Sequence, residues 1–130
     1  MNRKNLNILI VDKEDGGLGR ILEDKGYTVC VRKPEEVQEF VKNNLVHIAL
    51  IDVTDGNQVF GTVREANGLT QMIAVSTRAT VENVIAAMEN GANDFIFKPY
   101  MNMDNIVSIV EESEKKLVRW QTVLKNLGAL

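Results

Sequence analysis

Polar and charged side chains follow four apolar runs of this 130-residue chain, each at the point where the run ends. Asp12 and Asp52 supply carboxylates, Ser76 supplies a hydroxyl, and Lys98 supplies an ammonium group. Scattered polar residues would not be expected to terminate four runs in this way. In open α/β sheets, ligands bind outside the carboxyl ends of the strands. If the runs are parallel strands, these side chains would form one charged ligand site.

Five apolar runs rich in β-branched residues are the candidate strands. They do not alternate with polar residues, which indicates strands covered on both faces, as in a parallel sheet. Segments with helical spacing separate them, and Val81, Val84, Ile85 and Met88 form the clearest amphipathic stripe. This alternation predicts an α/β fold with a doubly wound parallel sheet, helices on both faces and right-handed crossovers. The runs cover residues 8–11, 29–31, 48–51, 72–75 and 95–97.

Glycine, proline and aspartate mark the ends of the expected helices. Gly26, Gly68 and Gly91 each follow a helical segment just before a strand, where a left-handed residue commonly closes a helix. Pro34 opens the second helix, since a missing N–H costs little there. Asp104 precedes the last helix and is expected to cap it. These positions divide the chain into five βα units.

Composition and charge exclude several classes of function. The formal net charge is −3, which argues against the clustered basic surface of a nucleic-acid-binding domain. The one cysteine, Cys30, cannot form an intrachain disulfide and lies in an apolar run, where a core position is expected. The apolar run before Asp12 is too short for a membrane span or a signal-peptide core. We therefore expect a cytoplasmic protein that binds neither nucleic acid nor membrane.

The C-terminal segment predicts an extended helix. Its apolar residues alternate spacings of three and four, an a/d heptad pattern that Ser113 interrupts. A helix over 104–126 would be about 35 Å long, whereas a five-residue strand spans about 17 Å. We therefore divide the chain into a domain over 1–118 and a helix overhang or linker over 119–130. The overhang would expose Trp120, Leu124 and Leu127 to a second copy of the chain or to a further domain.

Four motifs resemble those of one known family, the receiver domains of bacterial two-component response regulators. They are residues 8–12 (ILIVD), 48–52 (IALID), 74–76 (AVS) and 91–99 (GANDFIFKP). The last of them, Gly-Ala-x-Asp-aromatic-x-x-Lys-Pro, is the most specific. The resemblance covers nearly the whole chain, and it implies a flavodoxin-like fold with five strands in the order 2-1-3-4-5.

The resemblance also implies a role for each residue at the ends of the runs. Asp52 is similar to the phosphoacceptor, whose carboxylate attacks a phosphoryl group and forms an acyl phosphate. Lys98 resembles the lysine that pairs with this aspartate and then with a phosphoryl oxygen, and the peptide bond after it resembles one that is often cis. Ser76 and Phe95 resemble the residues that switch conformation, and Asp12 resembles an acid that holds Mg²⁺ together with Asp52. Such a domain is not an enzyme, and its partner is a sensor histidine kinase or a phosphotransfer protein.

Lys13 departs from the family pattern, in which a second acidic residue follows the first strand. At about 4 Å and an effective dielectric constant of about 20, a cation here would interact with a carboxylate by about 4 kcal/mol before desolvation. Lys13 could neutralise Asp52 or Asp12 and exclude Mg²⁺, or it could point to solvent at a site that binds the metal weakly. Glu14 or Asp15 could replace the missing ligand only if the loop shifts. We therefore expect Mg²⁺ binding at Asp12 and Asp52 to be weak or absent.

Two further departures lie beside Asp52. Thr77 stands where the family usually has a small residue, and its β-branched side chain would narrow access to Asp52. The loop over 53–56 is compressed, and Asp55-Gly56 is typical of a turn. We expect a phosphoacceptor receiver domain, and the departures leave open one alternative function, that of a pseudo-receiver whose interactions with other proteins carry a signal without phosphorylation.

A third interpretation is a nucleotide- or flavin-binding protein. Gly17 and Gly19 follow the first strand, as glycines do in a phosphate-binding loop. Leu22, however, occupies the third glycine position of G-x-G-x-x-G, and the loop lacks the Gly-Lys-Ser/Thr of a P-loop. We expect these glycines to form a flexible entry to a short helix.

Overall fold

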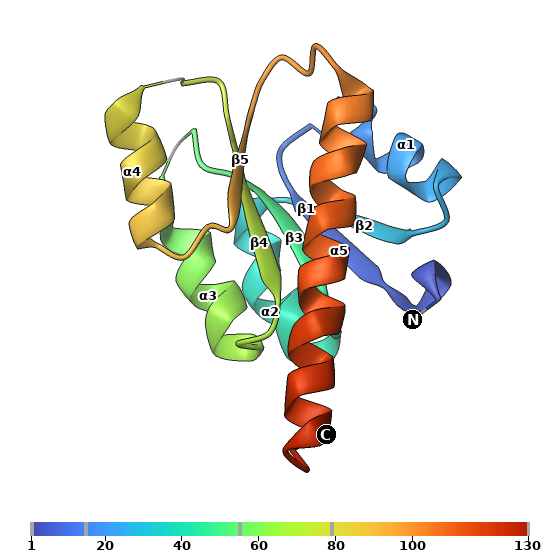
Figure 1. Cartoon of the computed structure of the whole chain (residues 1–130). Coiled ribbons are helices and arrows are strands. Elements are labelled where there is room, and N and C mark those ends of the chain that lie inside the picture. The colour runs from blue at the N-terminus through green and yellow to red at the C-terminus, as the bar shows by residue number, and fades with distance from the viewer. Residues whose placement is uncertain (1, 15, 55, 79, 130) are drawn as a thin grey trace.

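The computed structural model describes residues 2–14, 16–54, 56–78 and 80–129, which form a parallel five-stranded sheet between two layers of helices (Figure 1). The strands lie side by side in the order β2-β1-β3-β4-β5. Both the fold class and the strand order agree with the prediction. The strands are β1 (Asn7–Val11), β2 (Thr28–Arg32), β3 (Ile48–Asp52), β4 (Gln71–Ser76) and β5 (Asp94–Phe97).

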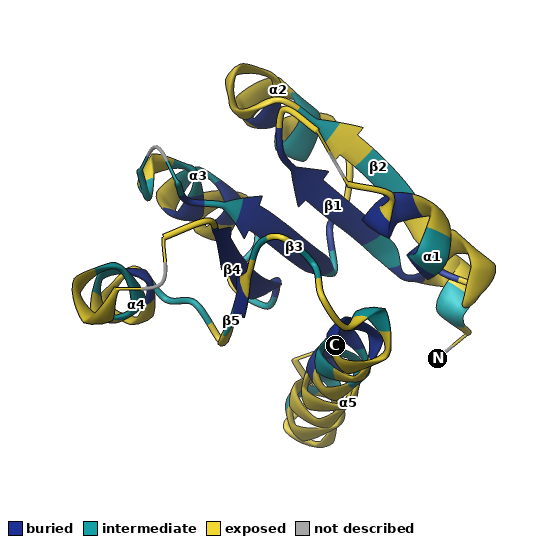
Figure 2. Cartoon of the chain, turned by 90° about the horizontal axis from the view of Figure 1, so that it is seen from above, coloured by how far each residue is buried: buried dark blue, intermediate teal, exposed yellow. Residues whose placement is uncertain are grey.

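The helices divide between the two faces of the sheet, as Figure 2 shows from above. Helices α1 and α5 cover one face, and α2, α3 and α4 cover the other. Their bounds are α1 (Leu18–Asp24), α2 (Val37–Asn43), α3 (Gln58–Ala66), α4 (Val81–Glu89) and α5 (Met103–Asn126), and two 3₁₀ turns cover Arg3–Asn5 and Pro34–Glu36.

Alternate residues of each central strand face opposite helical layers. In β3, Ile48 and Leu50 pack with α1 and α5, whereas Ala49 and Ile51 pack with α2, α3 and α4. All four side chains are buried. Because burying a large aliphatic side chain contributes about 1.5–3 kcal/mol, a strand that is apolar on both faces is stable only in a sheet covered on both sides.

Helix α5 has the predicted length and extends past the sheet at its C-terminal end (Figure 1). Leu117 is buried, whereas Trp120 is 51% exposed and Leu127 is 77% exposed. The cap of the helix differs from the prediction. Asn102 accepts a 3.1 Å hydrogen bond from a backbone N–H of the first turn, and Asp104 lies within that turn. The Asn102 side chain reaches this N–H because the backbone of Asn102 is extended. Asp104 has a helical backbone and therefore cannot cap the helix in this way.

The apolar stripe of α4 predicts the helix but not the face that it buries. Val81, Ile85 and Met88 are exposed, and Ala87 is the buried residue of this helix. Helix α4 lies against β5, the edge strand of the sheet (Figure 2), so little of its circumference meets the core. A small side chain at the contact lets the two backbones approach closely.

One of the three expected left-handed glycines does not adopt that conformation. Gly26 and Gly91 have φ values of +100° and +101°, as predicted. Gly68 does not have a positive φ, because Asn67 ends α3 in an extended conformation with φ −159°. The Asn67 side chain accepts a 2.9 Å hydrogen bond from the backbone two residues later, so a polar turn replaces the glycine cap.

Candidate functional site

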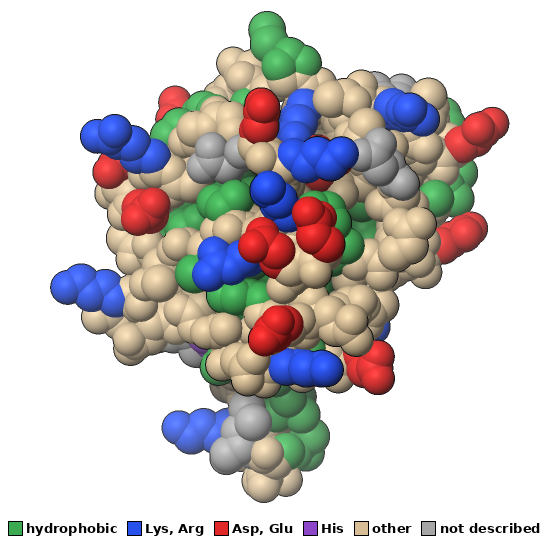
Figure 3. Space-filling view, turned by 180° about the vertical axis from the view of Figure 1, so that it is seen from behind, with side chains coloured by type: hydrophobic (Ala, Val, Ile, Leu, Met, Phe, Trp, Pro, Cys, Tyr) green, Lys and Arg blue, Asp and Glu red, His purple; other side chains and the backbone are tan. Residues whose placement is uncertain are grey.

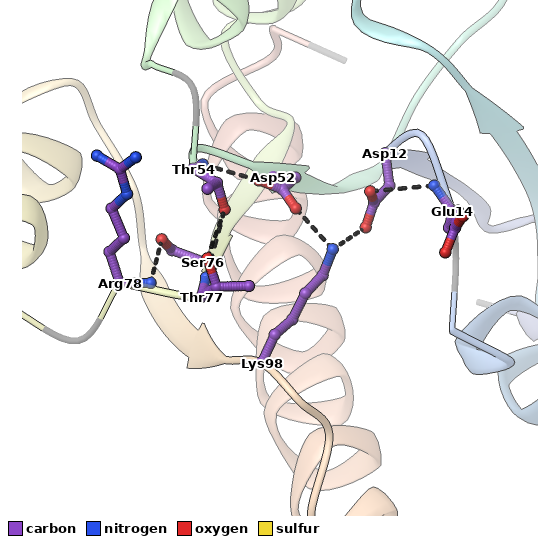
Figure 4. Close-up of polar contacts among 8 residues, drawn as sticks. All are labelled: Asp12, Glu14, Asp52, Thr54, Ser76, Thr77, Arg78 and Lys98. Atoms are coloured by element: carbon purple, nitrogen blue, oxygen red, sulfur yellow. Dashed lines mark hydrogen bonds and ion pairs between the residues drawn. The ribbon is translucent and has the colours of Figure 1, made fainter.

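Four strands end at the same edge of the sheet, and their ends carry the predicted polar side chains. Asp12 directly follows β1, Asp52 and Ser76 are the last residues of β3 and β4, and Lys98 directly follows β5. The parallel registers align these ends. All four residues therefore lie at one rim of the molecule, as the sequence predicts (Figure 4).

The Lys98 ammonium bridges the two carboxylates. Its Nζ donates hydrogen bonds to Oδ2 of Asp12 and, at 2.6 Å, to Oδ2 of Asp52. The side chains of Lys98 and Asp52 are each 17% exposed and that of Asp12 is 8% exposed, so solvent screens these ion pairs only in part. The Lys98–Pro99 peptide bond is cis, as the resemblance implied.

Backbone N–H groups hold the other oxygen of each carboxylate. Asp52 Oδ1 accepts a 2.7 Å hydrogen bond from the Thr54 backbone, and Asp12 Oδ1 accepts one of 3.2 Å from the Glu14 backbone. Each aspartate thus closes a tight turn at the end of its strand. Both carboxyl groups are fixed in orientation before any ligand arrives.

The surroundings favour opposite charges on Asp52 and Lys98. Burial raises the pKa of Asp52, but hydrogen bonds from Lys98 and from Thr54 outweigh it, so the pKa lies below its usual value. Burial lowers the pKa of Lys98, but hydrogen bonds to Asp12 and Asp52 raise it above its usual value. At neutral pH Asp52 is therefore a carboxylate, which is the state that a nucleophile requires.

Ser76 is buried, and its hydroxyl forms a local turn. Its Oγ accepts a 2.9 Å hydrogen bond from the backbone N–H of Arg78. A serine hydroxyl that accepts one bond still has a proton to donate. Ser76 can therefore donate a hydrogen bond to a further acceptor while its Oγ still accepts the bond from Arg78.

Phe95 lies on β5 and packs against the core beneath α4. It is half-buried, and its ring centroid is 5.0 Å from that of Phe97, which is exposed. Phe95 lies on the same face of the sheet as α4, away from the carboxylates. Phe95 and Lys98 are linked directly along the chain through β5, which ends at Phe97.

Thr54 is a residue of this rim that the sequence interpretation did not single out. Its hydroxyl accepts a hydrogen bond from the Thr77 backbone N–H at 3.3 Å (Figure 4). The prediction for Thr77 concerned its bulk, whereas the structure adds this contact between loops. A signal for it was present in the sequence, because both threonines lie just beyond strands expected to be neighbours.

Lys13 lies on the wall of a small hollow beside the two acids. The hollow has a volume of about 90 Å³, and Asp12, Asp52 and Gln58 also line it. The Lys13 residue is exposed. Among the described contacts, Lys98 supplies the ammonium group that bonds to both carboxylates. The expected neutralisation of Asp52 or Asp12 by Lys13 stays a prediction.

The rim offers two carboxylates to a metal ion. Mg²⁺ commonly binds through one or two carboxylates with water and phosphate oxygens, so Asp12 and Asp52 fit the minimum requirement. Among the described residues, no group of three or more His, Cys, Asp or Glu side chains could hold a metal. Asp15 and Asp55, whose roles as a substitute ligand and as a turn residue were predicted, lie outside the described residues.

Comparison with known proteins gives one consistent family. A family model described as the response regulator receiver domain matches residues 8–111. The swarming motility regulation protein RssB of Serratia marcescens is 28% identical over 134 residues, which cover 96% of this chain and 60% of the relative. The nitrogen assimilation regulatory protein NtrX of Azorhizobium caulinodans is 28% identical over 121 residues, which cover 85% of this chain and 26% of the relative. The chain thus spans only part of the length of both relatives.

Solved structures agree on the fold. A CheY-like response regulator receiver domain protein from Methanospirillum hungatei has a TM-score of 0.79 at 24% identity, covering 88% of this chain and 97% of that one. NtrX from Brucella abortus has a TM-score of 0.83 at 19% identity, covering 92% of this chain and 29% of that one. At these identities the likeness establishes the fold alone.

Proposed function

This chain belongs to the family of response regulator receiver domains of two-component signalling, and we propose that its signal is a phosphoryl group carried on Asp52. The observation that carries the proposal is the Lys98 ammonium, which lies 2.6 Å from the Asp52 carboxylate at the rim where four strands end. An ionised carboxylate can act as a nucleophile, and the fixed cation beside it would balance the negative charge of the phosphoryl group in the product.

The proposed reaction transfers a phosphoryl group from a phosphohistidine of a partner to Asp52. A carboxylate oxygen of Asp52 forms a bond to phosphorus, the bond from phosphorus to the imidazole nitrogen breaks, and the nitrogen keeps the electron pair. Lys98 then donates a hydrogen bond to a phosphoryl oxygen in place of the lost carboxylate charge. The chain binds and orients the group but, on this proposal, is not itself an enzyme.

We propose that Ser76 and Phe95 transmit the change. The Ser76 hydroxyl donates toward the phosphoryl group, which draws the loop after β4 toward Asp52. Phe95, packed beneath α4, then changes its position as the loop moves. The exposed residues of α4, which include Val81 and Met88, lie where such a movement would be sensed by another protein.

Asp12 and Asp52 are the residues that would hold Mg²⁺. Bound there, the ion would neutralise charge on the transferring phosphoryl oxygens. We propose that this binding is weak or absent, because a cation, Lys13, stands where a third acidic ligand would be expected, and because Lys98 already bonds one oxygen of each acid.

A second candidate function is a pseudo-receiver that signals through protein contacts alone. The observation in its favour is again at the rim, where Lys98 forms ion pairs with both acids and Lys13 lines the hollow beside them. Such a site could imitate the charge balance of a phosphorylated domain. The two functions differ in a single measurable property, the formation of an acyl phosphate.

Acetyl phosphate separates the two candidates. The chain is incubated with acetyl phosphate and Mg²⁺, and intact mass is measured for the wild type, for Asp52→Asn and for the control Asp24→Asn, which removes an exposed acid at the end of α1. We expect one phosphoryl adduct on the wild type and on the control, and none on Asp52→Asn. An adduct that survives Asp52→Asn would reject Asp52 as the acceptor, and no adduct on any protein would favour the pseudo-receiver.

Response regulators act with sensor histidine kinases or phosphotransfer proteins, and we propose such a partner here. The face shown in Figure 3 mixes basic and acidic side chains, in keeping with a net charge of −3, which favours a protein partner over nucleic acid. Helices in the described part of the chain are too short or too polar to span a bilayer. We propose a cytoplasmic location for the chain.

The end of α5 is a proposed second interaction site. Trp120 and Leu127 are exposed beyond the sheet on a helix with a heptad pattern. A second copy of the chain or an effector domain could cover them. Sedimentation of the chain and of a form trimmed after Leu117 tests this proposal, because a monomer at high concentration in both cases would contradict dimerisation through the overhang.

A further inference from the structure

Thr54 joins the loop after β3 to the loop after β4, directly beside Asp52. Its hydroxyl accepts a hydrogen bond from the Thr77 backbone N–H at 3.3 Å, and the two threonine hydroxyl oxygens lie 3.5 Å apart. Its own backbone N–H donates to Asp52 Oδ1 at 2.7 Å. A single residue, Thr54, thus contacts both Asp52 and the loop after β4 (Figure 4).

The strand register explains why the two threonines meet. Asp52 pairs with Val75 in the ladder between β3 and β4. The Val53 N–H continues this ladder, since it donates to the Val75 carbonyl at 2.8 Å. Thr54 lies two residues after Asp52, and Thr77 lies two residues after Val75. The two threonines therefore face each other just beyond the ends of β3 and β4.

We propose that Thr54 is a positioning residue that withholds the Thr77 N–H from a phosphoryl group on Asp52, an inference that rests on the proposed function. The Thr77 N–H is a backbone donor at the rim of the site, and its present acceptor is a neutral hydroxyl. Donors of this kind bind anionic oxygens more strongly than neutral ones. A phosphoryl oxygen can take this donor only after the Thr54 hydroxyl has turned away.

This arrangement slows phosphorylation without preventing it. With acetyl phosphate, an Asp52 oxygen forms the new bond to phosphorus, the bond between phosphorus and the acetyl oxygen breaks, and acetate leaves with the electron pair. The transferring group must displace one neutral hydrogen bond before it gains the Thr77 N–H. The cost falls on the rate of adduct formation, and the Thr54 backbone bond to Asp52 is unaffected.

Three variants test the inference against the wild type. Thr54→Ala removes the hydroxyl but keeps the backbone N–H that donates to Asp52, and Thr54→Ser restores a hydroxyl. Thr62→Ala is the matched control, since it removes a threonine side chain from α3, outside the contacts of the rim. Initial rates of adduct formation with acetyl phosphate and Mg²⁺ are measured by intact mass. We expect Thr54→Ala to react about fivefold faster, a change in the range of one neutral hydrogen bond, and the other two variants to match the wild type.

A second readout follows the Thr77 N–H itself. Hydrogen exchange of this amide, measured by NMR, should be faster in Thr54→Ala than in the wild type and should return toward the wild-type rate in Thr54→Ser. Urea midpoints for all four proteins establish that they are folded.

The outcomes separate the inference from the function on which it rests. Equal or slower adduct formation in Thr54→Ala, with an adduct on the wild type, would overturn the role of Thr54 and leave Asp52 as the acceptor. No adduct on any of the four proteins would overturn the proposed function, and the role of Thr54 with it. Faster reaction of Thr54→Ala without rescue by Thr54→Ser would show a loss of bulk rather than of the hydrogen bond, and would also overturn the inference.

Discussion

The Nζ atom of Lys98 lies 2.6 Å from Oδ2 of Asp52, although the two residues are 46 positions apart in the chain. The same ammonium also bonds to Asp12, so one cation faces two acids at the rim. Neither acid is fully neutralised by a cation that the two share. Among the groups that lower the pKa of Asp52 against the effect of burial, the hydrogen bond from Lys98 is the largest.

Lys98→Met should raise the pKa of Asp52. Burial, which opposes the charged form, remains in this variant, and the hydrogen bonds and the positive charge of Lys98 are lost. NMR titration of the Asp52 carboxyl carbon measures the change. Lys116→Met, which removes an exposed lysine of α5, is the control and should leave the Asp52 titration unchanged. An unaltered titration in Lys98→Met would contradict the dominance of this ion pair.

Stability in acid should reflect the same carboxylate. The pKa of Asp52 in the folded chain lies below its usual value of 3.8. The unfolded chain therefore takes up this proton first, and the stabilisation by Asp52 is present above about pH 4 and is lost as the pH falls through the folded pKa. Urea unfolding from pH 7 to pH 3 should show a difference between wild type and Asp52→Asn that changes only at the acidic end. A difference that is constant over the whole range would contradict this linkage.

His47 should make stability depend on pH in a different range. Its Nδ1 accepts a 3.0 Å hydrogen bond from the Asn7 backbone N–H, and burial lowers its pKa. The unfolded chain binds a proton below about pH 6.5 while the folded chain resists it, so stability should fall as the pH drops below this value. His47 is the single histidine of the chain, so His47→Gln should remove most of this slope between pH 7.5 and 5.5. An equal slope in wild type and variant would reject the assignment.

Arg3 should stabilise the contact between the N-terminal segment and α5. It donates to Glu111 at 2.7 Å, lies 3.3 Å from Glu114, and stacks on the Tyr27 ring at 4.9 Å. Arg3 and Glu111 are each about a third exposed, so Arg3→Ala should lower the free energy of unfolding by only about 0.5–1 kcal/mol, and by less at high salt. Lys4→Ala, an exposed neighbour, should have no such salt-dependent effect. Equal urea midpoints for the two variants would show that the network contributes nothing.

Two glycine substitutions should have opposite effects on stability. Gly91 has φ +101°, so Gly91→Ala should cost about 1–2 kcal/mol, since alanine is strained there. The added methyl group would also displace the Arg64 guanidinium, which donates to the Gly91 carbonyl. Gly61 lies within α3 with open space around it, so Gly61→Ala should stabilise the chain by about 0.5–1 kcal/mol. Thermal unfolding of both variants checks the signs, and a stable Gly91→Ala would refute the argument from φ.

Long-range features of the fold could be predicted because they repeat a simple physical pattern. Apolar runs without polar alternation can be buried only in a sheet covered on both faces, and the order β2-β1-β3-β4-β5 agrees with the family resemblance. The stripe of α4 could not be placed in the same way. Periodicity predicts a helix with an apolar face, but the position of α4 at the edge strand leaves Val81 and Met88 exposed and buries Ala87.

By itself, the sequence determined which chemical groups stand at the ends of the strands. Asp12, Asp52, Ser76 and Lys98 were identified because a residue at the C-terminal end of a parallel strand lies at the carboxyl edge of the sheet, whatever its rotamer. Tertiary structure alone decided how these groups pair. That Lys98 bonds both acids, and that the Thr54 hydroxyl takes the Thr77 N–H, depends on the register between strands and on side-chain rotamers. A hydrogen bond requires distances within a few tenths of an ångström, and only the packed chain sets such distances between residues far apart in sequence.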